Sequence, residues 1–420
     1  MLEESTVQGA GLPRILTLDT PIREYAWGSV TAIPAMLGIP ATGRPAAELW
    51  MGAHPDNPSR WAADPDRPGL DALISADPQS LLGAETVAAF GPRLPFLLKV
   101  LAADKSLSMQ VHPNLAQAQA GYAAEEQRGL AHDSPERNYT DPNHKPELLC
   151  ALTPFKALCG FRPVADTVRL LDALVAVGVD ELQPYRNLLA GEDGVRATFT
   201  TVLTLPERAQ RALTERVLRG CQVLADHGGE FSAAAGASLL AAADFPQDVG
   251  AVLALLLNYV ELQPGEAIFL GAGNVHAYLR GVGVELLANS DNVLRCGLTP
   301  KHLDIPELLR VADFHPLADP YARPVVLSQY EKLFQVGVTD FSLTVVTPAG
   351  SAVDLDPDLA ALVLCADGEI SIVTRDPVEQ APVTLSPGRA VFVRVGDQAV
   401  QVSGSGTAFV AQPGLADPGR

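Results

Sequence analysis

The sequence has few cysteines, and none of them forms a recognisable pair. The five residues Cys150, Cys159, Cys221, Cys296 and Cys365 are odd in number, scattered, and show no Cys-x-x-Cys spacing. Disulfide-stabilised secreted domains and thiolate zinc sites both need closely spaced or paired cysteines. We therefore expect buried free thiols in a protein of the reducing cytoplasm.

Positive charge and long apolar runs are also scarce. The chain of 420 residues has 49 Asp and Glu against 30 Lys and Arg, a formal net charge of −19. This balance disfavours nucleic acid and anionic membranes as partners. The N-terminal residues MLEESTVQGAG lack the basic and apolar regions of a secretory signal. The longest apolar run, residues 249–260 (VGAVLALLLNYV), is too short to span a bilayer and predicts a buried helix.

What the sequence does contain is enough apolar residues, 47% of the total, for a large core. The length favours two or three domains. Residues 164–258 hold apolar residues at helical spacing and are rich in alanine, which predicts a helical insertion. Asp166 could cap its first helix, and Pro206 suits the first turn of a later one.

An internal repeat follows the helical block. Residues 262–270 (LQPGEAIFL) and 385–393 (LSPGRAVFV) share Leu, Pro, Gly, Ala and Phe at matching positions. The pattern predicts strand, Pro-Gly turn, strand, as at the corner of a jelly-roll barrel. Two such barrels are the natural inference. His276 follows the first copy, but the equivalent position after the second copy is Ala399. A metal would therefore bind only in the first barrel.

Four ligand-type residues lie in segments around this repeat. Gln110 and His112 in SMQVHPN would face the same side of a strand. Taken alone, they could equally be a hydrogen-bonded core pair. Glu147 and His276 complete a set of two nitrogens and two oxygens. That set suits Zn²⁺, and less decisively Fe²⁺, Mn²⁺ or Co²⁺, in an open catalytic site.

Longer motifs identify a family. The segment GVGVELLANSDNVLRCGLTPKH (residues 281–302) resembles the signature of type I mannose-6-phosphate isomerases, the phosphomannose isomerases. The segments EYAWGS, AELWMGAHP, QVHPN, YTDPNHKPE and HAYL resemble further family segments in the same order. The resemblance covers most of the chain, including the helical insertion. It implies that Gln110, His112, Glu147 and His276 bind one zinc ion per chain.

The resemblance also implies a fold and an oligomeric state. The fold is mainly β: a bicupin, with two jelly-roll barrels and an inserted helical domain. We expect residues 1–163 and 259–319 to form the catalytic cupin domain and residues 164–258 the helical domain. Residues 320–420 would form a cupin-like domain without metal ligands. A monomer is the expected state.

The reaction implied by the family interconverts mannose 6-phosphate and fructose 6-phosphate through a cis-enediol, without a redox cofactor. It needs a Lewis acid, a base that reaches two carbons, and a cationic anchor for the phosphate. Glu285, Lys145, His144 and Asp291 are the candidates for proton transfer and substrate contact, and the base itself is not assigned. For Asp291, a turn residue bonded to its own backbone is the alternative.

The same resemblance suggests how the phosphate is held. Arg295 and Lys301 are the main candidates, with Lys99 and Ser108 as helpers, and Arg295 also has a catalytic role in this reading. Arginine offers a two-pronged fork and lysine a point charge to a phosphate dianion. As alternatives, Lys99 could extend from a strand end to solvent, and Arg295 could form a structural ion pair.

Two other functions remain open on the sequence alone. One is a sugar-phosphate-binding bicupin without catalytic activity. The other is a metal-dependent cupin oxygenase, since two histidines and one carboxylate also suit Fe²⁺. His54, which precedes a proline, is expected to pack or donate a hydrogen bond rather than bind a metal.

Overall fold

The structure is a computed structural model that describes residues 12–63, 69–375 and 380–415. The segment MLEESTVQGAG, where we expected no signal peptide, lies outside these residues. Within the described ranges, no helix combines the length and the apolar character needed to cross a membrane. All five cysteines are free and buried, as expected from their spacing.

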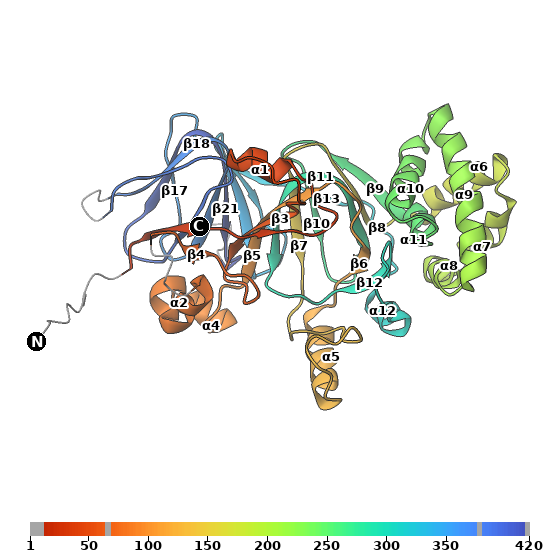
Figure 1. The fold of residues 1–420 in the computed structure, drawn as a ribbon, viewed down its shortest axis with the longest axis horizontal. Coiled ribbons are helices and arrows are strands. Elements are labelled where there is room, and N and C mark those ends of the chain that lie inside the picture. Colours follow the sequence, from red (N-terminus) through yellow and green to blue (C-terminus); the bar gives the residue numbers. More distant parts are fainter. Residues whose placement is uncertain (1–11, 64–68, 376–379, 416–420) are drawn as a thin grey trace, which may run out of the picture.

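Eleven strands of the described chain form an antiparallel sheet in the middle of the molecule (Figure 1). Strand β11 joins its parts, because residues 276–280 pair with β8 whereas residues 281–288 pair with β5 and β7. The strands are β2 (Ile22–Arg23), β3 (Glu48–Gly52), β5 (Phe96–Ala103), β6 (Met109–Val111), β7 (Glu147–Ala151), β8 (Phe155–Phe161), β9 (Leu257–Leu262), β10 (Ala267–Leu270), β11 (His276–Ala288), β12 (Leu294–Gly297) and β13 (Tyr321–Ala322).

A second antiparallel sheet, with ten strands in the same described residues, contains most of the C-terminal part. Its first strand in the sequence, β1, comes from the N-terminal part and pairs with β20. No pattern in the sequence predicts this pairing. The strands are β1 (Ile15–Asp19), β4 (Arg60–Trp61), β14 (Val325–Ser328), β15 (Glu331–Phe334), β16 (Ser342–Val346), β17 (Val353–Asp354), β18 (Ala361–Thr374), β19 (Val383–Leu385), β20 (Ala390–Val393) and β21 (Val400–Gln412).

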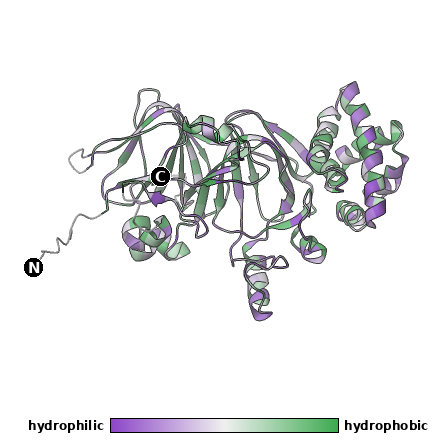
Figure 2. Ribbon diagram, in the orientation of Figure 1, coloured by the Kyte–Doolittle hydropathy of each residue, from purple (hydrophilic) through white to green (hydrophobic). Residues whose placement is uncertain are grey.

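Helices α6 to α11 gather at the end of the molecule opposite the second sheet, whereas α2 and α4 lie beside that sheet (Figure 1). Helices α6 to α11 pack in one core with residues of β6, β8 and β12. Figure 2 shows apolar colour concentrated on the strands, whereas α9 and α5 are coloured largely as hydrophilic. The helices are α1 (Ala32–Leu37), α2 (Leu70–Ala76), α3 (Pro78–Leu82), α4 (Ala84–Phe90), α5 (Leu115–Gln127), α6 (Val164–Ala176), α7 (Gln183–Leu188), α8 (Gly194–Leu203), α9 (Glu207–His227), α10 (Ser232–Asp244), α11 (Gly250–Leu253) and α12 (Ile305–Val311), with 3-10 turns at Asp180–Leu182 and Ala254–Leu256.

Two expectations about the helical block are wrong. The apolar run of residues 249–260 is not one buried helix: it contains α11 and a 3-10 turn, and then enters strand β9 at Leu257. A run that is buried on all sides has no periodicity that separates helix from strand. Asp166 does not cap α6, whose N-cap is Pro163; it lies in the first turn and pairs with Arg169.

The internal repeat is confirmed as strand, turn, strand. The first copy runs from β9 to β10 and the second from β19 to β20. Gly265 and Gly388 stand at the same place in the two turns, with φ of 87° and 77°. Residues with side chains rarely adopt this left-handed conformation, which explains the Pro-Gly pair in both copies.

Alternation along the strands directs ionisable groups to the inside. All eight residues of β5 are buried. Leu98 and Val100 pack in the core shared by the two sheets, whereas Leu97, Lys99 and Leu101 alternate with them and face the other side. A strand covered on both faces is apolar nearly throughout. Lys99 is therefore the exception that marks the inner face as a place for chemistry.

Candidate metal centre and adjoining cavity

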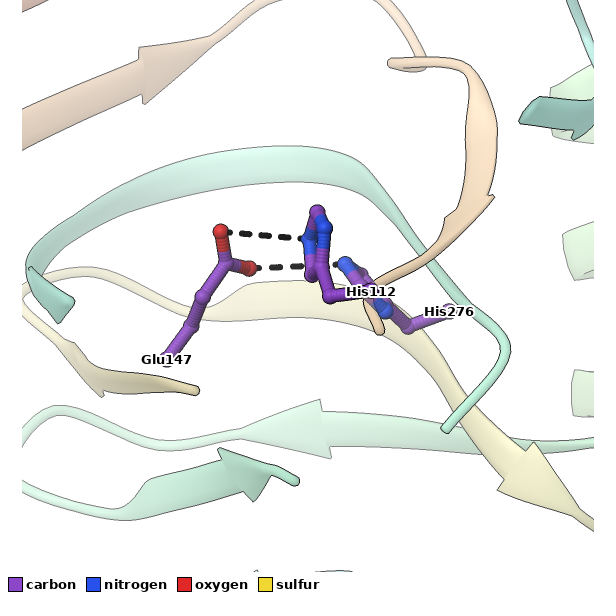
Figure 3. Close-up of side chains that lie close together, drawn as sticks. All are labelled: His112, Glu147 and His276. Atoms are coloured by element: carbon purple, nitrogen blue, oxygen red, sulfur yellow. Dashed lines mark ion pairs between the residues drawn. The ribbon is translucent and has the colours of Figure 1, made fainter. Parts of the chain in front are cut away.

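Three ligand-type side chains meet inside the central sheet. His112 follows β6, Glu147 begins β7 and His276 begins β11. One ligand atom of each lies within 4.8 Å of the others. The Nε2 atoms of His112 and His276 each lie 3.4 Å from a different oxygen of Glu147 (Figure 3). Segments up to 164 residues apart in the sequence thus converge on one buried point.

The hydrogen bonds of the two histidines leave their inward nitrogens free. Nδ1 of His112 lies 2.7 Å from the Asn292 carbonyl oxygen, and Nδ1 of His276 lies 3.0 Å from the carbonyl oxygen of Asn274. Nδ1 is therefore the protonated nitrogen in a neutral ring, and Nε2 carries the lone pair. Both Nε2 atoms and one oxygen of Glu147 are buried without a hydrogen-bond partner. Buried polar atoms need partners, so this trio fits a divalent cation.

The ionisation states suit a metal as well. Burial lowers the pKa of His112 to about 4, against the opposing pull of Glu147, so the ring is neutral at neutral pH. Burial also acts against ionisation of Glu147, but its interactions with His112 and with the charge of Lys145 hold the pKa of its carboxyl well below the usual value. A neutral imidazole and an ionised carboxylate are the forms in which histidine and glutamate bind zinc.

Gln110 lies beside this trio. Its backbone is the register partner of His276 between β6 and β11, and its side chain lines the neighbouring cavity. Cross-strand partners project to the same face of a sheet. The structure therefore places all four expected ligands in one region, three of them in mutual reach.

A cavity of about 590 Å³ opens next to the trio. Its wall includes Glu48 and Trp50 of β3, Lys99 of β5 and Glu285 of β11. Lys99 is the register partner of both Trp50 and Glu285, which explains why their side chains share the inner face. The ammonium group of Lys99 lies 3.7 Å from Glu48 and 3.5 Å from Glu285, and 5.1 Å from the ring centre of Trp50. Lys99 thus does not extend to solvent.

These buried ionisable groups shift one another's pKa values. Burial acts to lower the pKa of Lys99, but the carboxylates of Glu48 and Glu285 outweigh it and raise the pKa. Burial, followed by the charge of Glu147, raises the pKa of Glu285 to about 7. A carboxyl group that titrates near neutral pH can both accept and return a proton. A carboxyl group with this pKa suits acid–base chemistry, a role for which the sequence offers Glu285 as one of several candidates.

Two cations in the same wall have no carboxylate partner among the described residues. Arg295 on β12 lies opposite Gln110 of β6, and Lys301 follows a few residues later. Burial lowers the pKa of Arg295, and the charge of Arg295 in turn lowers the pKa of Lys301. Ser108 and Lys105 line the same cavity. Neighbouring cations that repel each other suit an anion as partner, and the structural ion pair considered for Arg295 is absent from the described chain.

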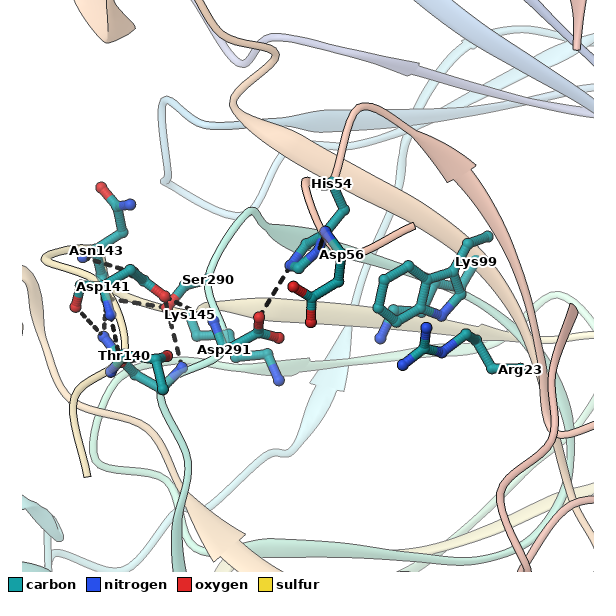
Figure 4. A network of polar contacts seen from close by, with 12 residues as sticks. Arg23, His54, Asp56, Lys99, Thr140, Asp141, Asn143, Lys145, Ser290 and Asp291 are labelled. Carbon is teal, nitrogen blue, oxygen red and sulfur yellow. Dashed lines mark hydrogen bonds and ion pairs between the residues drawn. The ribbon is translucent and has the colours of Figure 1, made fainter. Parts of the chain in front are cut away.

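The remaining candidates separate. The ammonium group of Lys145 lies 3.3 Å from Glu147 and lines the cavity. Asp291 also lines the cavity, and its carboxylate lies 3.2 Å from Nε2 of His54 (Figure 4). His144 is not in the cavity wall; its Nε2 lies 2.9 Å from the Asp340 carboxylate. The structure thus brings Lys145 and Asp291 to the site but not His144.

Asp291 was also considered as a turn residue that hydrogen-bonds only to its own backbone, but it contacts other segments. Its backbone N–H donates to Asp141, while its carboxylate faces His54 and Asp56. His54 is buried and stands edge-on to Trp50, so the packing expected of it is present, although His54, Asp56 and Asp291 also lie close enough together to hold a cation. Burial acts to raise the pKa of Asp291, but the hydrogen bond from His54 lowers it overall.

Comparison with known proteins decides the family. The model of the phosphomannose isomerase type I catalytic domain matches residues 15–164. The mannose-6-phosphate isomerases of Salmonella typhimurium and Escherichia coli are each 38% identical to this chain, over 93% of it and 97% of their own length. The human enzyme of that name is 30% identical over 91% of this chain and 93% of its own. The chain belongs to the type I mannose-6-phosphate isomerase family.

Solved structures of this family have the same fold. The zinc-bound form of a mannose 6-phosphate isomerase superposes with a TM-score of 0.85 at 35% identity, covering 95% of this chain and 99% of the other. The metal-free form from Salmonella typhimurium gives 0.85 and 35%, with 96% and 100% covered. The family resemblance read from the sequence is confirmed, and these matches favour neither a silent binding protein nor an oxygenase.

Three cavity residues of this family member were missed from the sequence. Glu48, Tyr278 and Lys105 line the cavity together with Trp50, for which the sequence favours a place in the core or the wall of a cleft. Glu48 also accepts a hydrogen bond of 2.6 Å from the Trp50 indole. The alternation of AELWMGA predicts a strand with Glu48 and Trp50 on one face, and this signal could have pointed to both. The hydroxyl of Tyr278 is buried without a partner, a state that only the tertiary structure reveals.

Proposed function

We propose that this chain catalyses the interconversion of mannose 6-phosphate and fructose 6-phosphate, with one zinc ion held by Gln110, His112, Glu147 and His276. The observation that carries the proposal is the set of buried, unpartnered Nε2 and carboxylate atoms beside a cavity whose wall holds two cations without a carboxylate partner among the residues that the structure describes. When bound there, zinc supplies a Lewis acid for the oxygens on C1 and C2 of the sugar.

The phosphate end of the substrate is held by Arg295, Lys301 and Ser108. The guanidinium of Arg295 offers paired donors, and Lys301 adds a point charge. Because neither cation has a carboxylate partner in the described chain, phosphate binding costs no broken ion pair. The lowered pKa of Lys301 reflects repulsion by Arg295. A bound phosphate dianion would reduce this repulsion.

Proton transfer between C1 and C2 is assigned to the interior carboxyl of Glu285, with Lys145 and Asp291 in contact with the substrate. The pKa of Glu285 supports the exchange of a proton at neutral pH. Lys145 lies beside Glu147, where its charge stabilises the anionic enediol. Lys99 sits between two carboxylates, so its proposed role moves from phosphate helper to keeping Glu285 in place.

The finer architecture is part of this proposal. The repeated strand–turn–strand unit and the two antiparallel sheets support a bicupin, with a helical domain inserted at residues 164–258. The catalytic cupin would comprise residues 1–163 and 259–319 and the second cupin residues 320–420. Strand β1 qualifies this division, since it completes the second sheet. We also retain the monomer as the proposed state.

A coupled assay with mannose 6-phosphate, run beside elemental analysis, tests this function. Wild-type protein is expected to turn over and to contain one zinc per chain; a chelator abolishes turnover and added Zn²⁺ restores it. Glu147→Ala loses both metal and activity, because it removes the only carboxylate of the trio. The control Glu369→Ala, an exposed position on β18, keeps both. Activity retained in metal-free protein would contradict the proposal.

A further inference from the structure

The connection between α10 and α11 holds the loop that carries the anion-binding cations. This connection consists of residues 245–249 and follows Asp244, the last residue of α10. The carboxylate of Asp248 accepts hydrogen bonds from the backbone N–H groups of Leu298, at 3.0 Å, and Thr299, at 3.2 Å. It also accepts one from Gly250 at 2.7 Å. A single side chain of the helical block thus ties two consecutive amides of a cavity wall.

The backbone held in this way is unusual. Leu298 has a φ of 53°, a left-handed conformation that is uncommon for a residue with a side chain. The backbone segments around Gly250 and Leu298 also come very close here, since a Cβ at Gly250 would lie 2.8 Å from the Leu298 nitrogen. Hydrogen bonds from outside the loop are what keep such a conformation populated.

The loop of residues 298–301 separates two cavities. A second cavity of about 520 Å³ lies against it, and Thr299 and Pro300 line both this cavity and the one beside the metal centre. Side-chain packing therefore supports little of one face of the loop. Arg295 is fixed by the pairing of β12 with β6, but Lys301 lies at the far end of the loop, and its place depends on how the loop is held.

The other end of the connection does the same for a second loop. The Asp244 carboxylate accepts a 2.7 Å hydrogen bond from the Ser106 N–H and pairs with Arg280 at 2.7 Å. Residues 105–108, which include Lys105 and Ser108, line the cavity. Two aspartates four residues apart thus reach both loops that supply candidate anion-binding groups.

We propose that Asp248, with Asp244 in support, is a positioning residue that sets the affinity of the cavity for the substrate phosphate. This inference rests on the proposed function. It gives the helical block a role in catalysis, although that block contributes no metal ligand. Asp248 does not touch the substrate; it acts through the loop of residues 298–301 and hence through Lys301.

The test is Asp248→Asn in the full-length zinc-loaded protein. Asparagine keeps one acceptor oxygen but turns the other into an N–H donor, which faces the Thr299 N–H. We expect the KM for mannose 6-phosphate to rise about tenfold while kcat changes less than about twofold, since a hydrogen bond to a charged group is lost at the phosphate side only. The inhibition constant of inorganic phosphate should rise by the same factor, with zinc content unchanged.

The matched control is Asp172→Asn on α6. Asp172 is also an aspartate of the helical block, but it forms an exposed ion pair with Arg186. The control should leave KM, kcat and the phosphate inhibition constant unchanged. Should Asp248→Asn fail to fold, Asp244→Asn tests the same connection through the other loop, with a smaller rise in KM and in the phosphate inhibition constant.

The outcomes separate this inference from the function on which it rests. If the wild type turns over mannose 6-phosphate but both aspartate variants keep its KM and phosphate inhibition constant, the inference is wrong and the function stands. A lowered melting temperature with an unchanged phosphate inhibition constant gives Asp248 a structural role only, which also overturns the inference. No turnover in the wild type overturns the function and this inference with it.

Discussion

Strands β11 and β21 follow the two copies of the repeat, but the residues at their equivalent inner positions are ionisable in β11 and apolar in β21. Glu285 on β11 pairs in register with Lys99 of β5, whereas Ala408, 123 residues further along on β21, pairs with Val346 of β16. His276 at the start of β11 has Ala399 as its counterpart. The scaffold is the same in both places, but only the first copy has a polar interior.

The difference shows where the molecule gives up stability. Removing an ion from water costs several kcal/mol that a buried ion pair seldom recovers, and apolar residues of similar volume are often at least as stable. Val346 and Ala408 belong to an apolar core inside the second sheet. The first sheet instead keeps Lys99 and Glu285 buried. We infer that the second sheet contributes stability and the first sheet contributes chemistry.

The largest expected effect comes from neutralising the buried carboxyl of the first sheet. The pKa of Glu285 is raised from 4.5 to about 7 in the folded chain. Between these two pH values the folded chain therefore keeps a proton that the unfolded chain releases. Stability is therefore lost as the pH rises from about 4.5 to 7. In metal-free protein, Glu285→Gln removes this loss, so its stability relative to wild type should increase by up to about 3 kcal/mol between pH 5 and pH 8.

Urea unfolding of both metal-free proteins at the two pH values measures this difference. Glu369→Gln, at an exposed position on β18, supplies the baseline for the same substitution in the second sheet. A stability difference that is equal at pH 5 and pH 8 would mean that Glu285 titrates near its usual value. The comparison between the sheets would then lose its electrostatic basis.

The next effect sharpens the contrast between the cavity and the surface of the second sheet. Arg295→Ala should lower kcat/KM for mannose 6-phosphate about 100-fold, or about 2.7 kcal/mol, because charge-assisted hydrogen bonds to the phosphate are lost. Zinc content should not change, since Arg295 is no part of the buried trio. Arg375→Ala, which breaks an exposed ion pair with Asp354, is the control and should leave kcat/KM unchanged. Loss of zinc in Arg295→Ala would refute the separation of the two roles.

The sequence predicts the faces of strands better than their partners. Alternation predicts that Gln110 and His112 share one side of a strand, whereas for Lys99 the sequence leaves open whether it helps to bind phosphate or extends to solvent. The position-by-position repeat also singled out His276, because its counterpart is alanine. The gathering of His112, Glu147 and His276 followed from these signals with the family resemblance, and their role as ligands stays a prediction.

Contacts between distant segments were beyond this reasoning. Nothing near Leu16 in the sequence shows that β1 pairs with β20, where its partner is Phe392. The contact between His144 and Asp340 also joins segments far apart in the sequence. His144 bonds to this carboxylate and does not line the cavity. Asp248 was missed for a related reason, because its acceptor role depends on backbone N–H groups that no side-chain motif reveals.

The smallest expected effect tests whether the second sheet is only a scaffold. Ile372 on β18 is fully buried in the apolar core of that sheet and is the register partner of Val402. Ile372→Val removes one methylene group and should lower the free energy of unfolding by about 1 kcal/mol. Zinc content and kcat/KM of the folded protein should not change, because in the described chain no residue of this core lines the cavity. If kcat/KM fell with stability, the two sheets would be coupled, and the polar interior of the first would depend on the packing of the second.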